Sequence, residues 1–218
     1  MNKRETIPQE TQSPLVTVIN PQTGEEVQVL PQYAELYKLN PDLVGWMWIP
    51  DTKLNYPVVQ RKSETDYYLY RDFYGSYDPH GCLYAREQCD VARPSDNITI
   101  YGHRMQDGSM MGQVGYYEQK SFWESHPLIY FDTLTEQHTY QIVYVLKTTA
   151  SVGEGFQYHL YVDFANENDF NNFVSGCRRN SLYDTGLSAE FGDKLITLST
   201  CEYTLVNGRL VIVAKRID

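Results

Sequence analysis

The sequence consists mainly of runs of β-forming residues that are separated by turn signals. The pattern predicts about eight strands with short helices inserted between them, and it shows no regular alternation of strands with long helices. An arrangement of this kind favours a closed or nearly closed β-barrel over a parallel α/β sheet. The 218 residues are enough for one domain of this type. We therefore expect a mainly β, single-domain fold.

Turn residues and helix signals place these elements along the chain. Residues 16–30 fit a hairpin around a Pro/Asn/Gly turn, and Pro31–Pro41 fits a short helix between two prolines. Ser63 and Asp66 form a capping box for a short helix at 63–73, and further helices are expected within 109–127 and at 163–179. The other expected strands are 43–50, 55–60, 81–87, 97–103, 128–134, 137–150, 194–200 and 208–217.

The N-terminal residues differ in composition from the rest of the chain. Residues 1–14 are polar and contain proline, which predicts a flexible leader. Residues 15–218 are expected to form one domain, with the hairpin and helix at about 15–42 and the barrel at about 43–218. No run of about 18 apolar residues and no signal-peptide core follow Met1. On composition alone, the protein is either cytoplasmic or attached by an N-terminal anchor that lies outside this chain.

The net charge and the cysteine spacing argue against two classes of function. The formal net charge is −10, whereas a general nucleic-acid binder shows a basic face. The four cysteines have no CxxC spacing, so we expect no structural zinc site. A chain of this length does not need disulfides, and we interpret Cys82, Cys89 and Cys177 as ordinary thiols.

The fourth cysteine, Cys201, ends a β-forming run, and a second such run begins after an Asn-Gly pair. An antiparallel return would bring Arg209 of the second run back beside the thiol. A thiol is a useful nucleophile only as a thiolate, so it needs a basic or cationic partner. His103 directly follows a β-forming run, and Gly102 before it lets the backbone bend. Each residue alone also fits core packing or a surface position, but the three together indicate a reactive site.

The segments that carry these residues resemble the catalytic motifs of sortases, the membrane-anchored cysteine transpeptidases of Gram-positive bacteria. They are TLSTC at 197–201, Arg209 on the following strand, and YGH at 101–103. The resemblance spans about residues 30–217 and includes NPDLVGWMWIP and YPVVQ, which are similar to segments that enter the sortase barrel. The resemblance implies an eight-stranded barrel.

Several features are similar to class B sortases. They are helices before the barrel, a helix at 163–179 between the sixth and seventh strands, and the segment TDYYLYRDF at 65–73. Two positions depart from the class pattern. Arg104 stands where many members have Asn after the catalytic His, and Thr65 stands where many also have Asn. These departures bear on the peptide preference and leave the three catalytic positions intact.

The resemblance implies a role for each motif residue. Cys201 would be the nucleophile, and His103 would protonate the leaving amine and later deprotonate the incoming one. Arg209 would stabilise the oxyanion and position the peptide, with the backbone N–H of Glu202 as a second candidate donor. The weaker candidates for lining the peptide groove are Thr65, Leu69, Ser199 and Thr200. The reference pKa of cysteine lies above that of histidine, which predicts a mostly neutral resting pair.

The implied reaction has two steps and needs no metal or other cofactor. The thiolate attacks the Thr carbonyl of an NPxTx-like C-terminal sorting signal and forms a thioester, which an amine then resolves. The implied partners are a sorting-signal-bearing surface protein or pilin and an amine of a peptidoglycan precursor or a pilin lysine, with no nucleic acid. The implied location is the outer face of the membrane, through an N-terminal anchor that lies outside this chain.

Two alternatives to this function stay open at the level of sequence. One is a thiol hydrolase or amidotransferase of another fold that uses the same Cys and His. The other is a non-catalytic cell-surface barrel that binds peptides and in which Cys201 is inert. In addition, NPQTG at 20–24 is similar to the signals that class B sortases cut. We interpret it as a turn, because Asn, Pro, Thr and Gly suit turns, and the alternative is that it acts as a self-substrate.

Overall fold

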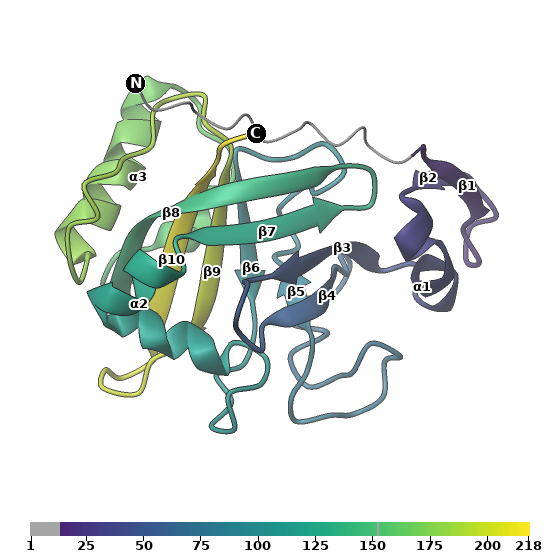
Figure 1. The fold of residues 1–218 in the computed structure, drawn as a ribbon, viewed down its shortest axis with the longest axis horizontal. Helices are drawn as coiled ribbons and strands as arrows, with labels where there is room; N and C mark the ends of the chain where they lie inside the picture. Colours follow the sequence, from purple (N-terminus) through teal and green to yellow (C-terminus); the bar gives the residue numbers. More distant parts are fainter. Residues whose placement is uncertain (1–13, 152) are drawn as a thin grey trace, which may run out of the picture.

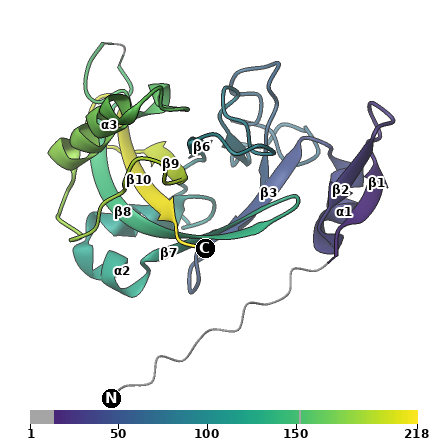
Figure 2. The ribbon, with the colours of Figure 1, turned by 90° about the horizontal axis from the view of Figure 1, so that it is seen from above.

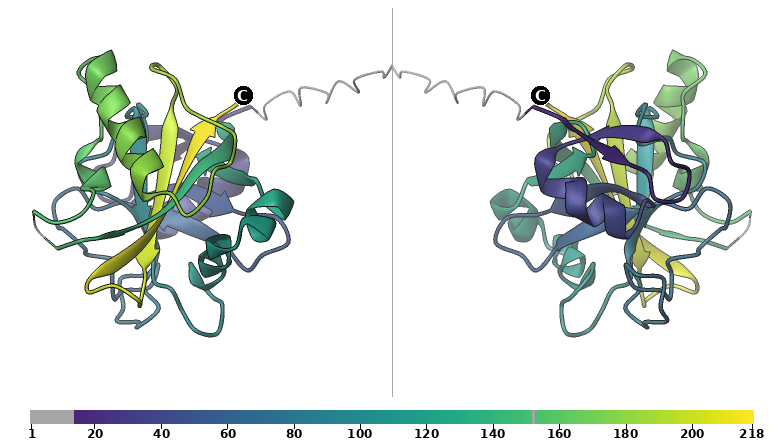
Figure 3. Two further views of the ribbon diagram at one scale, coloured as in Figure 1. Left: turned by 90° about the vertical axis from the view of Figure 1, so that its left-hand side faces the viewer. Right: turned by 90° about the vertical axis from the view of Figure 1, so that its right-hand side faces the viewer.

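The computed structural model describes residues 14–151 and 153–218 (Figure 1). The flexible leader expected at 1–14 therefore lies outside the described residues, apart from Pro14. Among the described residues, no helix combines the length and the apolar character that crossing a bilayer requires. A barrel occupies the centre of the molecule, with an N-terminal unit on one side and a long helix on the other (Figures 2 and 3).

Eight strands of the described chain form the closed barrel that the sequence predicts. They follow the order β10-β8-β7-β3-β4-β5-β6-β9, and β10 closes against β9. All neighbours are antiparallel except the β4–β5 and β6–β9 pairs, which are parallel. The strands are β3 Leu43–Trp48, β4 Asn55–Val59, β5 Leu83–Ala85, β6 Asn97–Tyr101, β7 Leu128–Thr133, β8 Gln137–Thr149, β9 Leu195–Cys201 and β10 Gly208–Arg216.

The two faces of the β9–β10 wall pack against different cores. Ile196 and Leu198 of β9 belong to the cluster that fills the barrel, together with Leu210 and Ile212 of β10. Residues that alternate with these along the strands, such as Val211, belong to a second cluster, which includes residues of the long helix. Successive side chains of a strand point to opposite faces, so these memberships identify the inner and outer faces of the wall.

The long helix α3 (Glu167–Asn180) covers the outer face of this wall. Phe170, Phe173, Val174 and Cys177 recur at helical spacing and are buried, which gives the helix one apolar face. The side chain of Asn166 accepts a hydrogen bond from the backbone of Asp169 and caps the N-terminus. The helix lies between β8 and β9, the sixth and seventh barrel strands, as the resemblance implies.

The N-terminal unit combines the expected hairpin and helix and packs beside β3 (Figures 1 and 2). It contains β1 (Val16–Ile19), β2 (Glu26–Val29), the 3₁₀ helix η1 (Pro31–Tyr33) and α1 (Ala34–Leu39). The NPQTG segment forms the turn between β1 and β2, as we interpreted it. The Asn20 carbonyl accepts from the Gly24 N–H at 2.8 Å, and Gly24 has a φ of 77°.

The other short helices lie in the connections between the barrel strands. The helical turns expected within 109–127 are η2 (Gly112–Glu118) and α2 (Lys120–Ser125), and η3 (Tyr158–Leu160) precedes α3. The prediction of a helix at 63–73 is wrong, because this segment forms turns. Asp66 has a φ of 54°, and its carboxylate accepts from the Tyr84 hydroxyl at 2.7 Å instead of capping a helix.

The cysteines away from Cys201 are buried and free, as interpreted from the sequence. Burial raises the pKa of the Cys82 thiol to about 12 and also raises the pKa of Cys177. A thiol with a raised pKa carries little thiolate at neutral pH, so these residues pack as small apolar groups.

Candidate active site

Cys201 and Arg209 lie directly opposite each other in the β9–β10 register. Side chains of an opposed antiparallel pair share one face and have Cβ atoms about 4.5–5.5 Å apart. Ile196 and Leu198 point into the barrel, so the alternation of β9 places Cys201 on the outer face. The antiparallel return that the sequence predicts is confirmed, and it places Arg209 opposite Cys201.

His103 reaches the same place from a strand about a hundred residues upstream in the chain. In the parallel β6–β9 pair, Tyr101 is aligned with Ser199. His103 and Cys201 each come two residues later, beyond the last aligned pair. The Thr200 hydroxyl donates to the Gly102 carbonyl oxygen at 2.8 Å, so the two chains stay adjacent at this point. The connections that follow β6 and β9 lie at the same end of the barrel (Figure 1).

The imidazole of His103 is oriented by the segment before β5. Its Nε2 lies 2.7 Å from the Leu69 carbonyl oxygen. A carbonyl oxygen only accepts hydrogen bonds, so Nε2 carries a proton and Nδ1 is the nitrogen that can take up or release one. The Tyr70 ring lies against the imidazole, with the ring centroids 5.1 Å apart. These contacts fix both the tautomer and the plane of the ring.

The side chain of Arg209 is anchored at the start of β10. Its Nη1 donates to the Gly208 carbonyl oxygen at 2.9 Å and to that of Asn207 at 3.3 Å. A guanidinium group has five N–H donors, so bonds from this one nitrogen leave donors for a ligand. Arginine remains protonated at all physiological pH values and can therefore supply a fixed positive charge beside the thiol.

A groove of about 320 Å³ is lined by Arg209, whereas neither Cys201 nor His103 lines it. Thr65 and Leu69, two of the groove candidates from the sequence, also line it. The Thr65 hydroxyl donates to the Glu87 carboxylate at 2.8 Å. The other lining residues are Asp66, Tyr84, Arg86, Glu87, Tyr101, Ala150, Tyr158 and His159.

Three of the sequence candidates do not line the groove with their side chains. Ser199 and Thr200 are each 2% exposed, and their hydroxyls bond to Tyr158 and to the Gly102 carbonyl. The Glu202 side chain is 1% exposed, and its N–H donates to the Gly208 carbonyl oxygen at 2.9 Å. The Glu202 N–H, the second candidate oxyanion donor, therefore already has a partner in this structure.

Sequence reasoning missed Arg86, Tyr158 and His159 as groove residues. Arg86 follows the short strand β5, and its Nη1 is buried without a hydrogen-bond partner in the described residues. Burial, followed by the charge of Arg86, lowers the pKa of His159 below its usual value. Tyr158 and His159 come from the connection between β8 and α3, and no local motif marks them.

The carboxylate of Glu202 stabilises the loop between Cys201 and Arg209. Its Oε2 accepts from the backbone of Thr204 and Leu205, and its Oε1 accepts from the Thr204 hydroxyl and from Lys147. Burial alone would raise the pKa of this carboxyl group. The bonds from Lys147 and Thr204 outweigh burial and lower its pKa to about 2. Glu202 is therefore ionised in the folded protein at all but very low pH.

This pKa predicts how the stability advantage of Glu202 over glutamine depends on pH. A carboxyl group whose pKa is depressed in the folded state stabilises the fold at pH values above its unfolded-state pKa. This contribution is lost as the pH falls towards the folded-state pKa. We expect the free energy of unfolding of wild type to exceed that of Glu202→Gln by a constant amount above about pH 5. The difference should shrink between about pH 4.5 and 2. Urea titrations across this range measure it, and a difference that stays constant down to pH 2 would contradict the assignment.

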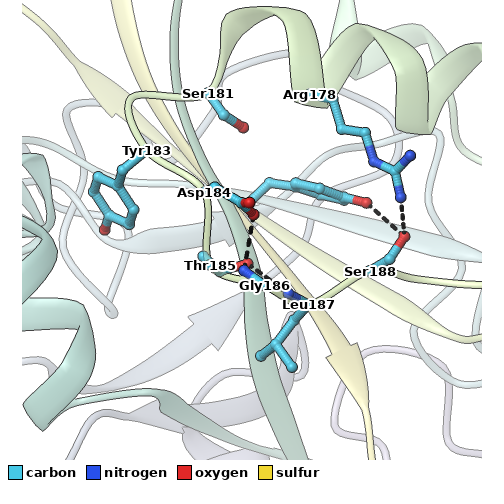
Figure 4. Close-up of a pocket in the computed structure, with 9 residues that line it drawn as sticks. Arg178, Ser181, Tyr183, Asp184, Thr185, Gly186, Leu187 and Ser188 are labelled. Atoms are coloured by element: carbon cyan, nitrogen blue, oxygen red, sulfur yellow. Dashed lines mark hydrogen bonds between the residues drawn. The ribbon is translucent and has the colours of Figure 1, made fainter.

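A second pocket, of about 580 Å³, lies between the C-terminal part of α3 and residues 181–188 (Figure 4). The Ser188 hydroxyl joins its two sides, since it lies 2.9 Å from the Tyr144 hydroxyl and 2.8 Å from Nη2 of Arg178. Its lining residues include neither a thiol nor an imidazole, and none of them lines the groove beside Arg209. This second pocket therefore offers no counterpart to the Cys201 thiol or the His103 imidazole.

Known proteins show the same fold and similar sequences. A family model described as the Sortase domain matches residues 47–217. Sortase B of Staphylococcus aureus (strain NCTC 8325 / PS 47) is 33% identical over 191 residues, which are 87% of this chain and 76% of that protein. A solved S. aureus sortase B–substrate complex has a TM-score of 0.78 at 33% identity, covering 87% of this chain and 86% of that one. A sortase B in complex with triglycine has a TM-score of 0.77 at 33% identity, covering 86% of each chain.

Proposed function

The chain belongs to the sortase family and is a cysteine transpeptidase, and we propose that Cys201, His103 and Arg209 carry its reaction. The observation that supports this assignment is their convergence at one end of the barrel wall. Arg209 is the register partner of Cys201, and His103 and Cys201 follow an aligned pair of parallel strands. A nucleophile, a proton carrier and a fixed cation are the groups that acyl transfer needs.

In the first step, the Cys201 thiol gives its proton to Nδ1 of His103, and the resulting thiolate attacks the carbonyl carbon after which the peptide is cleaved. Arg209 stabilises the negative charge that develops on the carbonyl oxygen. His103 donates a proton from Nδ1 to the leaving amine, while its Nε2 proton stays bonded to the Leu69 carbonyl. The carbon–nitrogen bond breaks, and the peptide remains attached to Cys201 as a thioester.

In the second step, an acceptor amine attacks the thioester. His103, now without its Nδ1 proton, accepts one from the attacking nitrogen. The tetrahedral intermediate again places negative charge beside Arg209, and its collapse releases the Cys201 thiolate and leaves a new amide bond. Each turnover therefore exchanges one amide for another and restores the enzyme.

We propose that the peptide is an NPxTx-like sorting signal of a surface protein or pilin. The similar S. aureus sortase B was solved with its substrate, and a groove of about 320 Å³ lies beside Arg209 here. We propose an amine of a peptidoglycan precursor or a pilin lysine as the acceptor, in line with the similar sortase B that holds triglycine. An enzyme with these partners works on the outer face of the membrane. An N-terminal anchor would hold it there.

A peptide that contains NPQTG, incubated with and without triglycine, tests this function. We expect cleavage after Thr, and a Thr–Gly amide product by mass spectrometry when triglycine is present. Cys201→Ala should give neither product, whereas Cys177→Ala, which removes a thiol on the buried face of α3, should give both. Cleavage that never yields the amide would favour a hydrolase. Failure of a panel of NPxTx peptides to react or to form a thioester would favour a peptide-binding barrel.

A further inference from the structure

Four charged side chains form a continuous chain of ion pairs between the loops that follow His103 and Cys201. Arg104 Nη1 lies 2.9 Å from Glu118 Oε1, and Glu118 Oε2 lies 2.9 Å from Lys147 Nζ. Lys147 Nζ lies 2.8 Å from Glu202 Oε1. Arg104 is the residue after His103, and Glu202 is the residue after Cys201. The chain therefore begins and ends beside the two groups that exchange the proton.

These ion pairs are shielded from water more than ordinary surface pairs. The exposed fraction of the four side chains is 22%, 27%, 19% and 1% for Arg104, Glu118, Lys147 and Glu202. Two positive and two negative charges alternate along the chain, so it is neutral as a unit. Burial alone would raise the pKa of Glu118, but its bonds to Lys147 and Arg104 hold that pKa below its usual value. Shielded and alternating pairs of this kind interact more strongly than exposed ones.

Two direct hydrogen bonds join the same loops on either side of the reactive pair. The Thr200 hydroxyl donates to the Gly102 carbonyl, one residue before His103. The Tyr203 hydroxyl donates to the Arg104 carbonyl at 3.0 Å, one residue after His103. The residues before and after His103 are thus each bonded to a residue close to Cys201. The ion pairs reinforce the bond between Tyr203 and Arg104.

The backbone of η2 leaves space for the guanidinium group of Arg104. A Cβ atom built on Gly115 would collide with Nη2, Cζ and Nε of Arg104. The absence of a side chain at position 115 therefore lets Arg104 lie across η2 and reach Glu118 at its end. Arg104 is also one of the two positions that depart from the class B pattern in the sequence analysis.

We propose that Arg104, Glu118, Lys147 and Glu202 are positioning residues that hold His103 and Cys201 in the geometry for proton transfer. The proposal rests on the proposed catalytic roles of His103 and Cys201. Proton transfer and nucleophilic attack need reacting atoms at about 3–3.5 Å, and a misplacement of about 1 Å can cost about 100-fold in rate. None of the four side chains lines the groove beside Arg209, so their loss should affect kcat and leave KM unchanged.

The variants Arg104→Met and Arg104→Lys test the proposal. Methionine keeps a long stem without the charge, whereas lysine can still pair with Glu118. With the sorting peptide and triglycine, we expect Arg104→Met to lower kcat about tenfold with KM unchanged and Arg104→Lys to keep most of the activity. The double variant Arg104→Met/Glu118→Gln should lose little more than Glu118→Gln alone, because members of one network are not additive.

Gly115→Ala and Asp96→Asn separate positioning from charge and from general stability. The methyl group that Gly115→Ala adds would displace the Arg104 guanidinium without changing any charge, so kcat should fall as it does in Arg104→Met. Asp96 pairs with Lys194 at 2.8 Å where β6 and β9 begin, at the end of the strands away from Cys201. Asp96→Asn should lower the Tm and leave kcat unchanged.

The pH profile of Cys201 alkylation gives a readout that needs no substrate. We expect its midpoint to move to higher pH in Arg104→Met and to stay at the wild-type value in Arg104→Lys and Asp96→Asn. The thiolate loses a fixed imidazole partner in the Met variant. Equal kcat and equal midpoints in Arg104→Met and wild type would overturn the proposal. A wild type that forms no amide, with midpoints that still shift as described, would instead overturn the proposed function.

Discussion

Replacing His103 by glutamine is expected to lower kcat for amide formation by about 10²–10⁴-fold, the usual contribution of a general acid–base group. The glutamine amide can still donate to the Leu69 carbonyl, which now receives the bond from Nε2 of the imidazole at 2.7 Å. The variant therefore keeps the fixed side chain and loses only the group that carries the proton. The measurement is kcat from single-turnover and steady-state assays with the sorting peptide and triglycine.

The pH dependence shows whether the lost group is the proton carrier. A bell-shaped profile of kcat/KM reports the macroscopic pKa values of the interacting thiol and imidazole. The His103→Gln profile should lose one limb and keep the other. His80→Gln is the matched control, because His80 lies half-exposed beside Asp78 and lines no part of the groove. A His103→Gln enzyme within about threefold of wild type would rule out acid–base catalysis by this residue.

The parts of the site that the sequence predicts are those fixed by local signals. Cys201 and Arg209 are opposed because two strand runs are joined by a short connection that ends in Asn-Gly, and that register was readable from the spacing. The place of His103 depends on the parallel pairing of β6 with β9, which no local pattern encodes. The pattern of strand ends grouped His103 with Cys201 as a candidate, and the resemblance to sortases implied that the two act together.

The sequence candidates that the structure places elsewhere were misplaced for different physical reasons. Thr200 is adjacent to Cys201 in β9, so strand alternation alone sends its side chain to the opposite face. Ser199 shares the face of Cys201, but Tyr158 from a distant connection covers it, which a linear pattern cannot show. The capping box at Ser63 and Asp66 failed because a tertiary bond from Tyr84 captures the carboxylate. In each case a long-range contact or the pleat of the strand decided the outcome.

Replacing Arg209 by methionine is expected to lower kcat by about 10²–10³-fold, as the loss of one oxyanion donor typically does. Methionine keeps the apolar stem opposite Cys201 but removes the charge that meets the developing oxyanion. Lysine should recover only part of the rate, because an ammonium group lacks the planar fork of donors. The bonds of Arg209 to Gly208 and Asn207 are also lost, so the Tm of each variant must be measured beside its kcat.

The Arg209 result is decisive when it is compared with two further measurements. Arg216 lies at the far end of the same strand, where its charge faces Asp218, so Arg216→Met should leave kcat unchanged. The Cys201 thiol of Arg209→Met should still react with an alkylating reagent, because the nucleophile itself is intact. Loss of turnover with a thiol that remains reactive separates stabilisation of the oxyanion from activation of the thiol. An unchanged kcat in Arg209→Met would instead mean that the oxyanion is held by backbone donors, and Arg209 would then serve only to fix the loop after Cys201.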